Sequence, residues 1–223
     1  MALAKLVAVV PVRKGSQRVK NKNLKKFSDT NLLTFKIETL KKVKRIDNIV
    51  INTDSEEAIE IAKKLNVDYK IREDYFASSE CTNSEFWSHI AEQTKSEFII
   101  FTNCTSPLIK VETYNEIIDS FDISFPEHDS VNTVSEMKEY LYLDEKPLNF
   151  DPNKAPNSQD LPNVIKLNFA VNILKKETMQ KKKSLVGYKP SFYSLNDVES
   201  LDINTKYEFE YAEFLYDKYY RKN

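Results

Sequence analysis

Short apolar segments alternate with amphipathic ones along most of the chain, and this alternation constrains the fold more than any other feature. Several runs have the length and composition of strands: residues 6–10, 49–51, 69–71, 98–101, 130–135 and 164–174. Helical spacing or helix-start signals mark the segments 33–43, 56–65, 84–93, 111–121 and 208–221. The order predicts an α/β fold, with helices on both faces of a mainly parallel, twisted sheet.

A basic loop follows the first predicted strand. Residues 11–23 read PVRKGSQRVKNKN, with five cations and one of the two glycines in the chain. Backbone N–H groups around the glycine could converge on phosphate oxygens, and the Arg and Lys side chains would neutralise their charge. A solvated basic loop beside an edge strand explains the same residues, so the loop alone leaves both interpretations open.

Polar residues follow the carboxyl ends of three predicted strands. Arg13, Asp54 and Asn103 each come just after an apolar run. Ligands of parallel α/β sheets bind at this edge, so we expect the three side chains on one rim. Asp54 could be a cap or a site carboxylate, and we favour a structural role. Ser55 has the position of a helix N-cap.

Composition excludes several classes of function. The 223 residues fit one α/β domain with a small appendage, and the net charge of −1 argues against a general nucleic-acid binder. Two cysteines and two histidines supply neither a disulfide framework nor a multi-histidine metal site. No apolar run approaches the ~20 residues of a membrane-spanning helix, and no signal peptide is recognisable. We expect a reduced cytoplasmic protein without a membrane or nucleic-acid partner.

The segment 136–163 interrupts the alternation. It holds four prolines among several Asn and Asp residues, which predicts loops and short strands. Residues 1–135 are therefore expected to form an α/β core, 136–163 an oligomer arm or a lid, and 164–223 a return to the core. The tyrosine-rich stripe of the last helix predicts core or dimer packing. The run 181–183 of three lysines predicts a solvated turn.

Five short motifs follow one another along nearly the whole chain. The first loop contributes Pro11, Arg13, Gly15, Ser16, Lys22 and Asn23. The others are NTDS at 52–55, NCTSPLI at 103–109, SQDLP at 158–162 and DINT at 202–205. Together they resemble the motifs of the acylneuraminate cytidylyltransferase family, the CMP-sialic acid synthetases and their relatives. The resemblance implies that residues 1–135 bind the nucleotide. The resemblance implies a Rossmann-like nucleotidyltransferase that transfers CMP from CTP to the anomeric hydroxyl of a sugar acid and releases pyrophosphate.

The resemblance also implies roles for individual residues. Arg13 and Lys22 would contact the triphosphate as the catalytic cations, assisted by the backbone around Gly15 and Ser16. The remaining nucleotide contacts would be Asn23, Arg72 and Ser84, and the acceptor contacts Asn103, Gln159 and Asn168. Asp202, with Asn204, would bind the catalytic Mg²⁺, for which Mn²⁺ could substitute. The alternatives are a surface position for Arg72 and N-capping by Asp202.

The family also dimerises through the segment that corresponds to 136–163, which reaches towards the partner's active site. The resemblance therefore implies a homodimer that acts on CTP and a small sugar acid, such as sialic, legionaminic or pseudaminic acid, for cell-surface glycan synthesis.

Several positions depart from the family pattern. Lys14 replaces a glycine, Asn204 an aspartate, Ile109 an arginine and Phe169 a glycine; Ser158 replaces another arginine. The departures lie mostly in the acceptor half of the site. Two alternatives therefore stay open: a nucleotidyltransferase with a non-sialic acceptor or another nucleotide, and a catalytically weak nucleotide-binding homologue.

Overall fold

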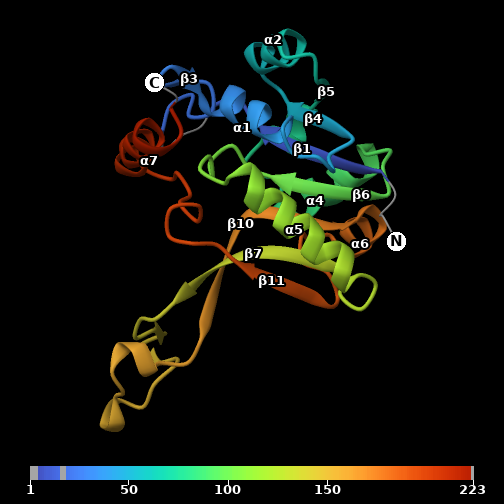
Figure 1. The fold of residues 1–223 in the computed structure, drawn as a ribbon. Coiled ribbons are helices and arrows are strands. Elements are labelled where there is room, and N and C mark those ends of the chain that lie inside the picture. The colour runs from blue at the N-terminus through green and yellow to red at the C-terminus, as the bar shows by residue number, and fades with distance from the viewer. Residues whose placement is uncertain (1–4, 16–18, 222–223) are drawn as a thin grey trace.

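A seven-stranded sheet with helices on both faces forms the body of the protein (Figure 1). The structure is a computed structural model and describes residues 5–15 and 19–221. The strands lie in the order β11 (Pro190–Ser194), β7 (Ser130–Met137), β10 (Val164–Lys175), β6 (Phe98–Thr102), β1 (Leu6–Val12), β4 (Asn48–Thr53) and β5 (Asp68–Ile71). All pairings are parallel except those of β10, which is antiparallel to both neighbours. The predicted α/β architecture with a mainly parallel sheet is confirmed.

Alternation of side chains along β1 divides the core between the two sheet faces. Leu6, Ala8 and Val10 belong to one buried cluster, and Val9 belongs to the other. The larger cluster includes residues of α1 (Leu32–Leu40), α2 (Glu56–Lys64), α5 (Val111–Ser124) and α7 (Lys206–Tyr219). The smaller one includes residues of α4 (Asn83–Gln93) and α6 (Lys176–Lys182). The short α3 (Asp74–Ala77) precedes α4.

Local signals set the helix starts. The Ser55 hydroxyl accepts a hydrogen bond from the Ala58 amide, so Ser55 is the N-cap of α2 as predicted. Thr205 caps α7 in a reciprocal capping box with Glu208. The prediction that Asp202 could cap this helix is therefore wrong. None of the helices within 5–15 and 19–221 is long and apolar enough to cross a membrane.

Residues 138–163 project from the sheet between β7 and β10 (Figure 1). They contain the two-residue strands β8 (Tyr142–Leu143) and β9 (Lys146–Pro147) and the 3₁₀ turns η1 (Pro152–Lys154) and η2 (Ser158–Asp160). We call this segment the arm. Its inner contact is aromatic: the ring of Phe150 lies 4.9 Å from Tyr140 and 5.5 Å from Tyr142, measured between centroids.

Candidate active site

The loops that follow β1 and β4 are joined directly. The Lys14 amide donates a 2.7 Å hydrogen bond to the Asp54 carboxylate, which lies one residue past β4. Parallel pairing of β1 with β4 and β6 puts Arg13, Asp54 and Asn103 at the same edge of the sheet. Asp54 therefore has the structural role that the sequence favoured, as an anchor for the basic loop rather than as a helix cap.

The basic loop needs glycine at one position. Gly15 has a φ of 77°, in the left-handed region, where a residue with a side chain costs roughly 1–2 kcal/mol more. Apart from its chain neighbours, no atom of the described residues lies within 4 Å of where a Cβ would stand, so the requirement is conformational rather than steric. Lys14, at the family's other glycine position, has a negative φ and brings no backbone strain. The predicted phosphate contact Ser16 lies outside the described residues.

Two distant motifs meet at the end of the basic loop. The Lys22 ammonium donates a hydrogen bond to the Ile203 carbonyl, between Asp202 and Asn204. The Ile203 amide in turn donates to the Thr105 carbonyl at 2.8 Å, in the loop that follows β6. The structure thus brings together the basic loop, the loop after β6 and the 202–205 motif. A cation beside a carboxylate at this edge can bind a phosphate chain together with a hard cation.

The 202–205 motif offers one carboxylate. The Asn204 side-chain amide donates a 2.6 Å hydrogen bond to Asp202 Oδ2, and both residues are half-buried. Among the described residues, no group of three or more His, Cys, Asp and Glu could hold a metal ion. Mg²⁺ commonly binds one or two carboxylates and completes its shell with waters and substrate phosphates. Asp202 therefore fits a metal that arrives with a nucleotide better than a resident one.

Arg72 is buried, so the alternative of a surface arginine is wrong. Its side chain is 5% exposed, and its Nε and one terminal nitrogen donate to the side-chain and backbone oxygens of Asn52 at 2.7 and 2.9 Å. The guanidinium lies 4.3 Å from the centre of the Phe86 ring. Burial lowers the pKa of Arg72 to about 10, which still leaves it charged at neutral pH. Ser84, in the first turn of α4, is exposed.

The three predicted acceptor residues do not meet within one chain. The Asn103 side-chain amide donates to the Phe169 carbonyl at 3.3 Å. The Asn168 side chain accepts from the Thr133 hydroxyl at 2.6 Å and donates to Ser135. Gln159 lies instead in the projecting arm, and no hydrogen bond in the described part of the chain ties it to the other two (Figure 1).

Phe169 has an unusual backbone. Its φ of 52° is left-handed, and it lies where the register between β10 and β7 shifts. Such a conformation is a genuine outlier for a bulky residue and is common next to active sites. The Phe169 carbonyl accepts from the amides of Asn103 and Asn172, and its ring packs 5.9 Å from Trp87. These contacts hold the bulge that presents Asn168.

A buried lysine supports the loop after β6, and sequence analysis did not identify it. Lys36 on α1 is fully buried, and its ammonium donates to the Ser106 carbonyl at 2.7 Å and to the Tyr114 hydroxyl at 2.8 Å. A buried ammonium requires such hydrogen bonds. One signal in the sequence could have indicated its burial: Lys36 lies at helical spacing from Leu33 and Leu40, on the apolar side of a predicted helix. Lys36 therefore fixes the loop that carries Asn103.

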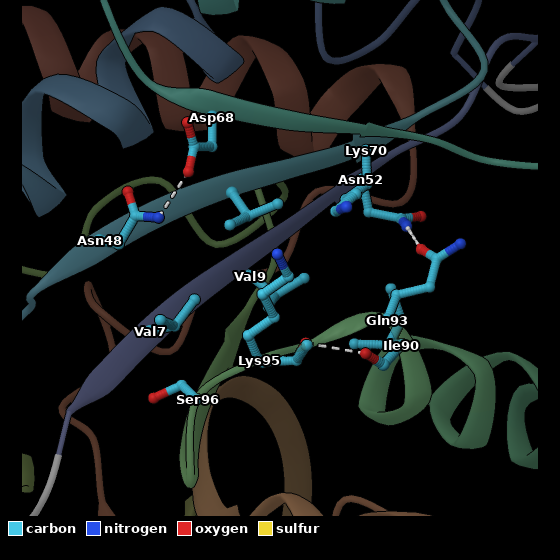
Figure 2. Close-up of a pocket in the computed structure, with 12 residues that line it drawn as sticks. Val7, Val9, Asn48, Asn52, Asp68, Lys70, Ile90, Gln93, Lys95 and Ser96 are labelled. Atoms are coloured by element: carbon cyan, nitrogen blue, oxygen red, sulfur yellow. Dashed lines mark hydrogen bonds between the residues drawn. The ribbon is translucent and has the colours of Figure 1, made fainter.

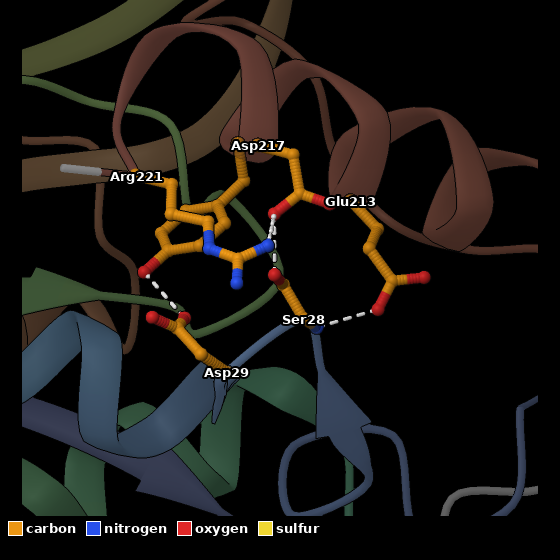
Figure 3. A network of polar contacts seen from close by, with 6 residues as sticks. Ser28, Asp29, Glu213, Asp217 and Arg221 are labelled. Carbon is orange, nitrogen blue, oxygen red and sulfur yellow. Dashed lines mark hydrogen bonds and ion pairs between the residues drawn. The ribbon is translucent and has the colours of Figure 1, made fainter. Parts of the chain in front are cut away.

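Polar contacts fasten α7 to the hairpin of β2 (Lys26–Phe27) and β3 (Thr30–Asn31), as Figure 3 shows. The Ser28 amide donates to Glu213 at 2.5 Å, and the Ser28 hydroxyl donates to Asp217. The Tyr216 hydroxyl donates to Asp29 at 3.0 Å, and burial with this contact raises the pKa of Tyr216 to about 12. The hairpin follows the basic loop, so these contacts hold both motifs of the site in place.

A cavity of about 180 Å³ lies between α4 and the face of β1, β4 and β5, mostly towards the amino ends of these strands (Figure 2). Val7, Val9 and Ile90 form part of its apolar lining. Asn52 and Gln93 line its polar side, and the Asn52 amide donates to the Gln93 oxygen at 3.1 Å. The cavity therefore reaches the residue that holds Arg72.

A cationic loop and a carboxylate at the carboxyl edge of a mainly parallel sheet form a site suited to a ligand that carries phosphates. Comparison with known proteins agrees, since a family model described as cytidylyltransferase matches residues 7–221. The chain belongs to this cytidylyltransferase family, as its resemblance to the CMP-sialic acid synthetases predicted, and it is a CTP-dependent nucleotidyltransferase.

Curated relatives match the chain at low identity. It is 25% identical to post-translational flagellin modification protein B of Campylobacter coli, over 96% of this chain and 95% of the relative. It is 23% identical to CMP-N,N'-diacetyllegionaminic acid synthase of Campylobacter jejuni, over 96% and 95%. An N-acylneuraminate cytidylyltransferase of Escherichia coli is 30% identical to this chain. The match covers 46% of this chain and 25% of the length of that relative.

A solved structure with a similar fold is CMP:2-keto-3-deoxy-manno-octonic acid synthetase complexed with CTP. Its TM-score is 0.72 at 11% identity, and the match covers 96% of this chain and 99% of that chain. At this identity the likeness supports the fold alone.

Proposed function

We propose that this enzyme transfers CMP from CTP to a nonulosonic acid, such as sialic, legionaminic or pseudaminic acid, and releases pyrophosphate. The observation that carries the proposal is the contact between Lys22 and the Ile203 carbonyl, which puts the basic loop beside Asp202. The names of the curated relatives support a sugar acid as the acceptor. The enzyme would act in the cytoplasm, and its product would be used for the synthesis of cell-surface glycans.

The nucleotide would lie across the edge of the sheet. Arg13 and Lys22 would bind the triphosphate with backbone N–H groups near Gly15, because cations that oppose the developing charge stabilise phosphoryl transfer. The buried side-chain oxygen of Asn23 has no hydrogen-bond partner among residues 5–15 and 19–221, which suits a donor from the nucleotide. Arg72 and Ser84, on the loop before α3 and on the first turn of α4, would complete the nucleotide contacts.

The oxygen atoms of Asp202 and Asn204 would hold Mg²⁺ or Mn²⁺, with the remaining ligands from CTP and water. Such a cation neutralises charge on the phosphate oxygens during transfer. Without it, Asp202 keeps Asn204 in place through their 2.6 Å hydrogen bond. Because Asn204 brings no charge, the protein would depend on the nucleotide to bring the metal.

The acceptor site would be completed by a second copy of the chain. Asn103 and Asn168 lie close together, in the loop after β6 and at the bulge of β10, whereas Gln159 lies in the arm. The arm exposes Tyr142, Leu143 and Leu148 by 57–60% each, and large apolar side chains gathered in a projecting segment suit a partner surface. We therefore propose a homodimer in which the arm of each subunit reaches the acceptor pocket of its partner.

A non-sialic acceptor is the second candidate, and one observation favours it. Ile109, where the family pattern has an arginine, is fully buried. This position offers no cation to the carboxylate of a sugar acid.

Pyrophosphate release from CTP and Mg²⁺, measured with a panel of nonulosonic acids and with 3-deoxy-octulosonic acid, separates the candidates. We expect release with at least one nonulosonic acid and a background rate with CTP alone. Pyrophosphate release with 3-deoxy-octulosonic acid but with no nonulosonic acid would favour the second candidate, a non-sialic acceptor.

A further inference from the structure

The hydrogen-bond partners of Arg72 are neutral, although the side chain is buried. Among the described residues, both side-chain hydrogen bonds of Arg72 go to Asn52: Nε donates to the side-chain oxygen at 2.7 Å and a terminal nitrogen donates to the backbone oxygen at 2.9 Å. Within residues 5–15 and 19–221, no ion pair joins Arg72 to a carboxylate. Buried charges in proteins are usually paired, so a guanidinium held by two neutral oxygens and the Phe86 ring is available to an anion.

The charges around Arg72 are mixed. Burial lowers the pKa of Arg72 most; among nearby ionisable groups, the Asp54 carboxylate raises this pKa and Arg13 lowers it. The Asp54 carboxylate accepts the Lys14 amide, and within the described residues it forms no ion pair with Arg72. Arg13 and Arg72 therefore act on one region, and Asp54 opposes their charge there without binding Arg72.

Asn52 is held so that its oxygen faces Arg72. The residue is 1% exposed on β4, and its amide nitrogen donates to the Gln93 oxygen at 3.1 Å (Figure 2). A reversed amide would put its nitrogen against Arg72 and its oxygen against the Gln93 oxygen. The three side chains thus form a chain of hydrogen bonds from α4 through β4 to Arg72.

We propose that Asn52 is a positioning residue: it holds Arg72 in place through a neutral oxygen and so leaves the positive charge of Arg72 for the nucleotide. This inference rests on the proposed function, in which Arg72 contacts CTP. A carboxylate at the same position would hold the guanidinium equally well, but it would cancel the charge. Asn52 therefore matters to function in two ways: its hydrogen bonds hold Arg72, and its lack of charge leaves the charge of Arg72 uncancelled.

The substitution Asn52→Asp separates holding from charge. Aspartate has nearly the same shape, and the Gln93 amide can rotate to donate to it. Calorimetry should show CTP binding weakened at least about tenfold relative to wild type, or ~1.4 kcal/mol. The urea midpoint of unfolding should stay at or above the wild-type value, because Arg72 gains an ion pair. A merely structural role for Asn52 would leave CTP affinity unchanged in the folded protein.

Asn48→Asp is the matched control, because Asn48 lies on the same strand about 13 Å away at 3.3 Å per residue. It should bind CTP as wild type does. Asn52→Ala provides a second variant if Asn52→Asp fails to fold. It removes the side-chain acceptor without adding charge and should weaken CTP binding at least about threefold by releasing Arg72.

Wild-type CTP affinity in folded Asn52→Asp, or in folded Asn52→Ala, would overturn the inference. An equal loss of affinity in Asn48→Asp would overturn it too, since the effect would then be a general one of added charge. A wild-type protein that binds no CTP would instead contradict the proposed function.

Discussion

The substitution Asn204→Asp tests the account of the 202–205 motif. Asn204 now donates a 2.6 Å hydrogen bond to Asp202, and the substitution would put a second carboxylate at that contact. Two charges about 4 Å apart repel by roughly 4 kcal/mol at an effective dielectric constant of about 20. Since both residues are only partly buried, screening by solvent leaves about 1–2 kcal/mol. Loss of the hydrogen bond adds about 1 kcal/mol, so the metal-free protein should lose about 2–3 kcal/mol of stability.

Mg²⁺ should reverse that loss, because a cation between two carboxylates stabilises the folded state in proportion to its binding. Urea unfolding with and without millimolar Mg²⁺ measures both effects, and the Mg²⁺ concentration for half-maximal activity should fall. Asn157→Asp is the matched control, since Asn157 also donates to an aspartate, Asp160, but in the exposed arm. An undiminished stability without Mg²⁺, or a higher Mg²⁺ requirement, would refute the reasoning.

The remaining predictions concern the basic loop, helix α5 and the arm. Arg13→Ala and Lys22→Ala should each lower kcat/KM for CTP at least about tenfold, and wild-type kinetics in both variants would exclude the loop as the phosphate site. Glu199→Ala should lower the free energy of unfolding by about 3–5 kcal/mol in urea titration, because the buried carboxylate accepts hydrogen bonds from the Lys110 amide, the Thr113 hydroxyl and the Asn196 amide. Light scattering at micromolar concentration should give a dimer mass for wild type and a monomer mass for Leu143→Asp; an active wild-type monomer would contradict the role of the arm.

Periodicity in the sequence predicted most of the fold because burial repeats at every second residue in strands and at helical spacing in helices. The edge strand β11 was missed because Pro190–Ser194 alternates only weakly, and its exposed side needs no apolar residues. Helix α6 was also missed. The lysines predicted to form a turn occupy its last turn, where Lys181 and Lys182 are exposed, and Lys183 ends it with a left-handed C-cap.

The site could be predicted only as far as its motifs reach. Arg13, Lys22 and Asp202 became candidate site residues because each belongs to a motif, and the structure brings Lys22 and the 202–205 motif together. Lys36 and Glu199 could not be identified, because their roles depend on partners distant in the sequence. The burial of Arg72 was hidden for the same reason: Asn52, which holds it, lies 20 residues earlier on another strand.

Mass spectrometry of the reaction products, paired with pyrophosphate quantification, tests the central claim most directly. Purified protein would be incubated with CTP, Mg²⁺ and the most active nonulosonic acid. The account predicts a CMP conjugate of the sugar acid and pyrophosphate in equal amounts, each dependent on all three components. Pyrophosphate without a conjugate, or no product from any nonulosonic acid by a protein that binds CTP, would contradict it.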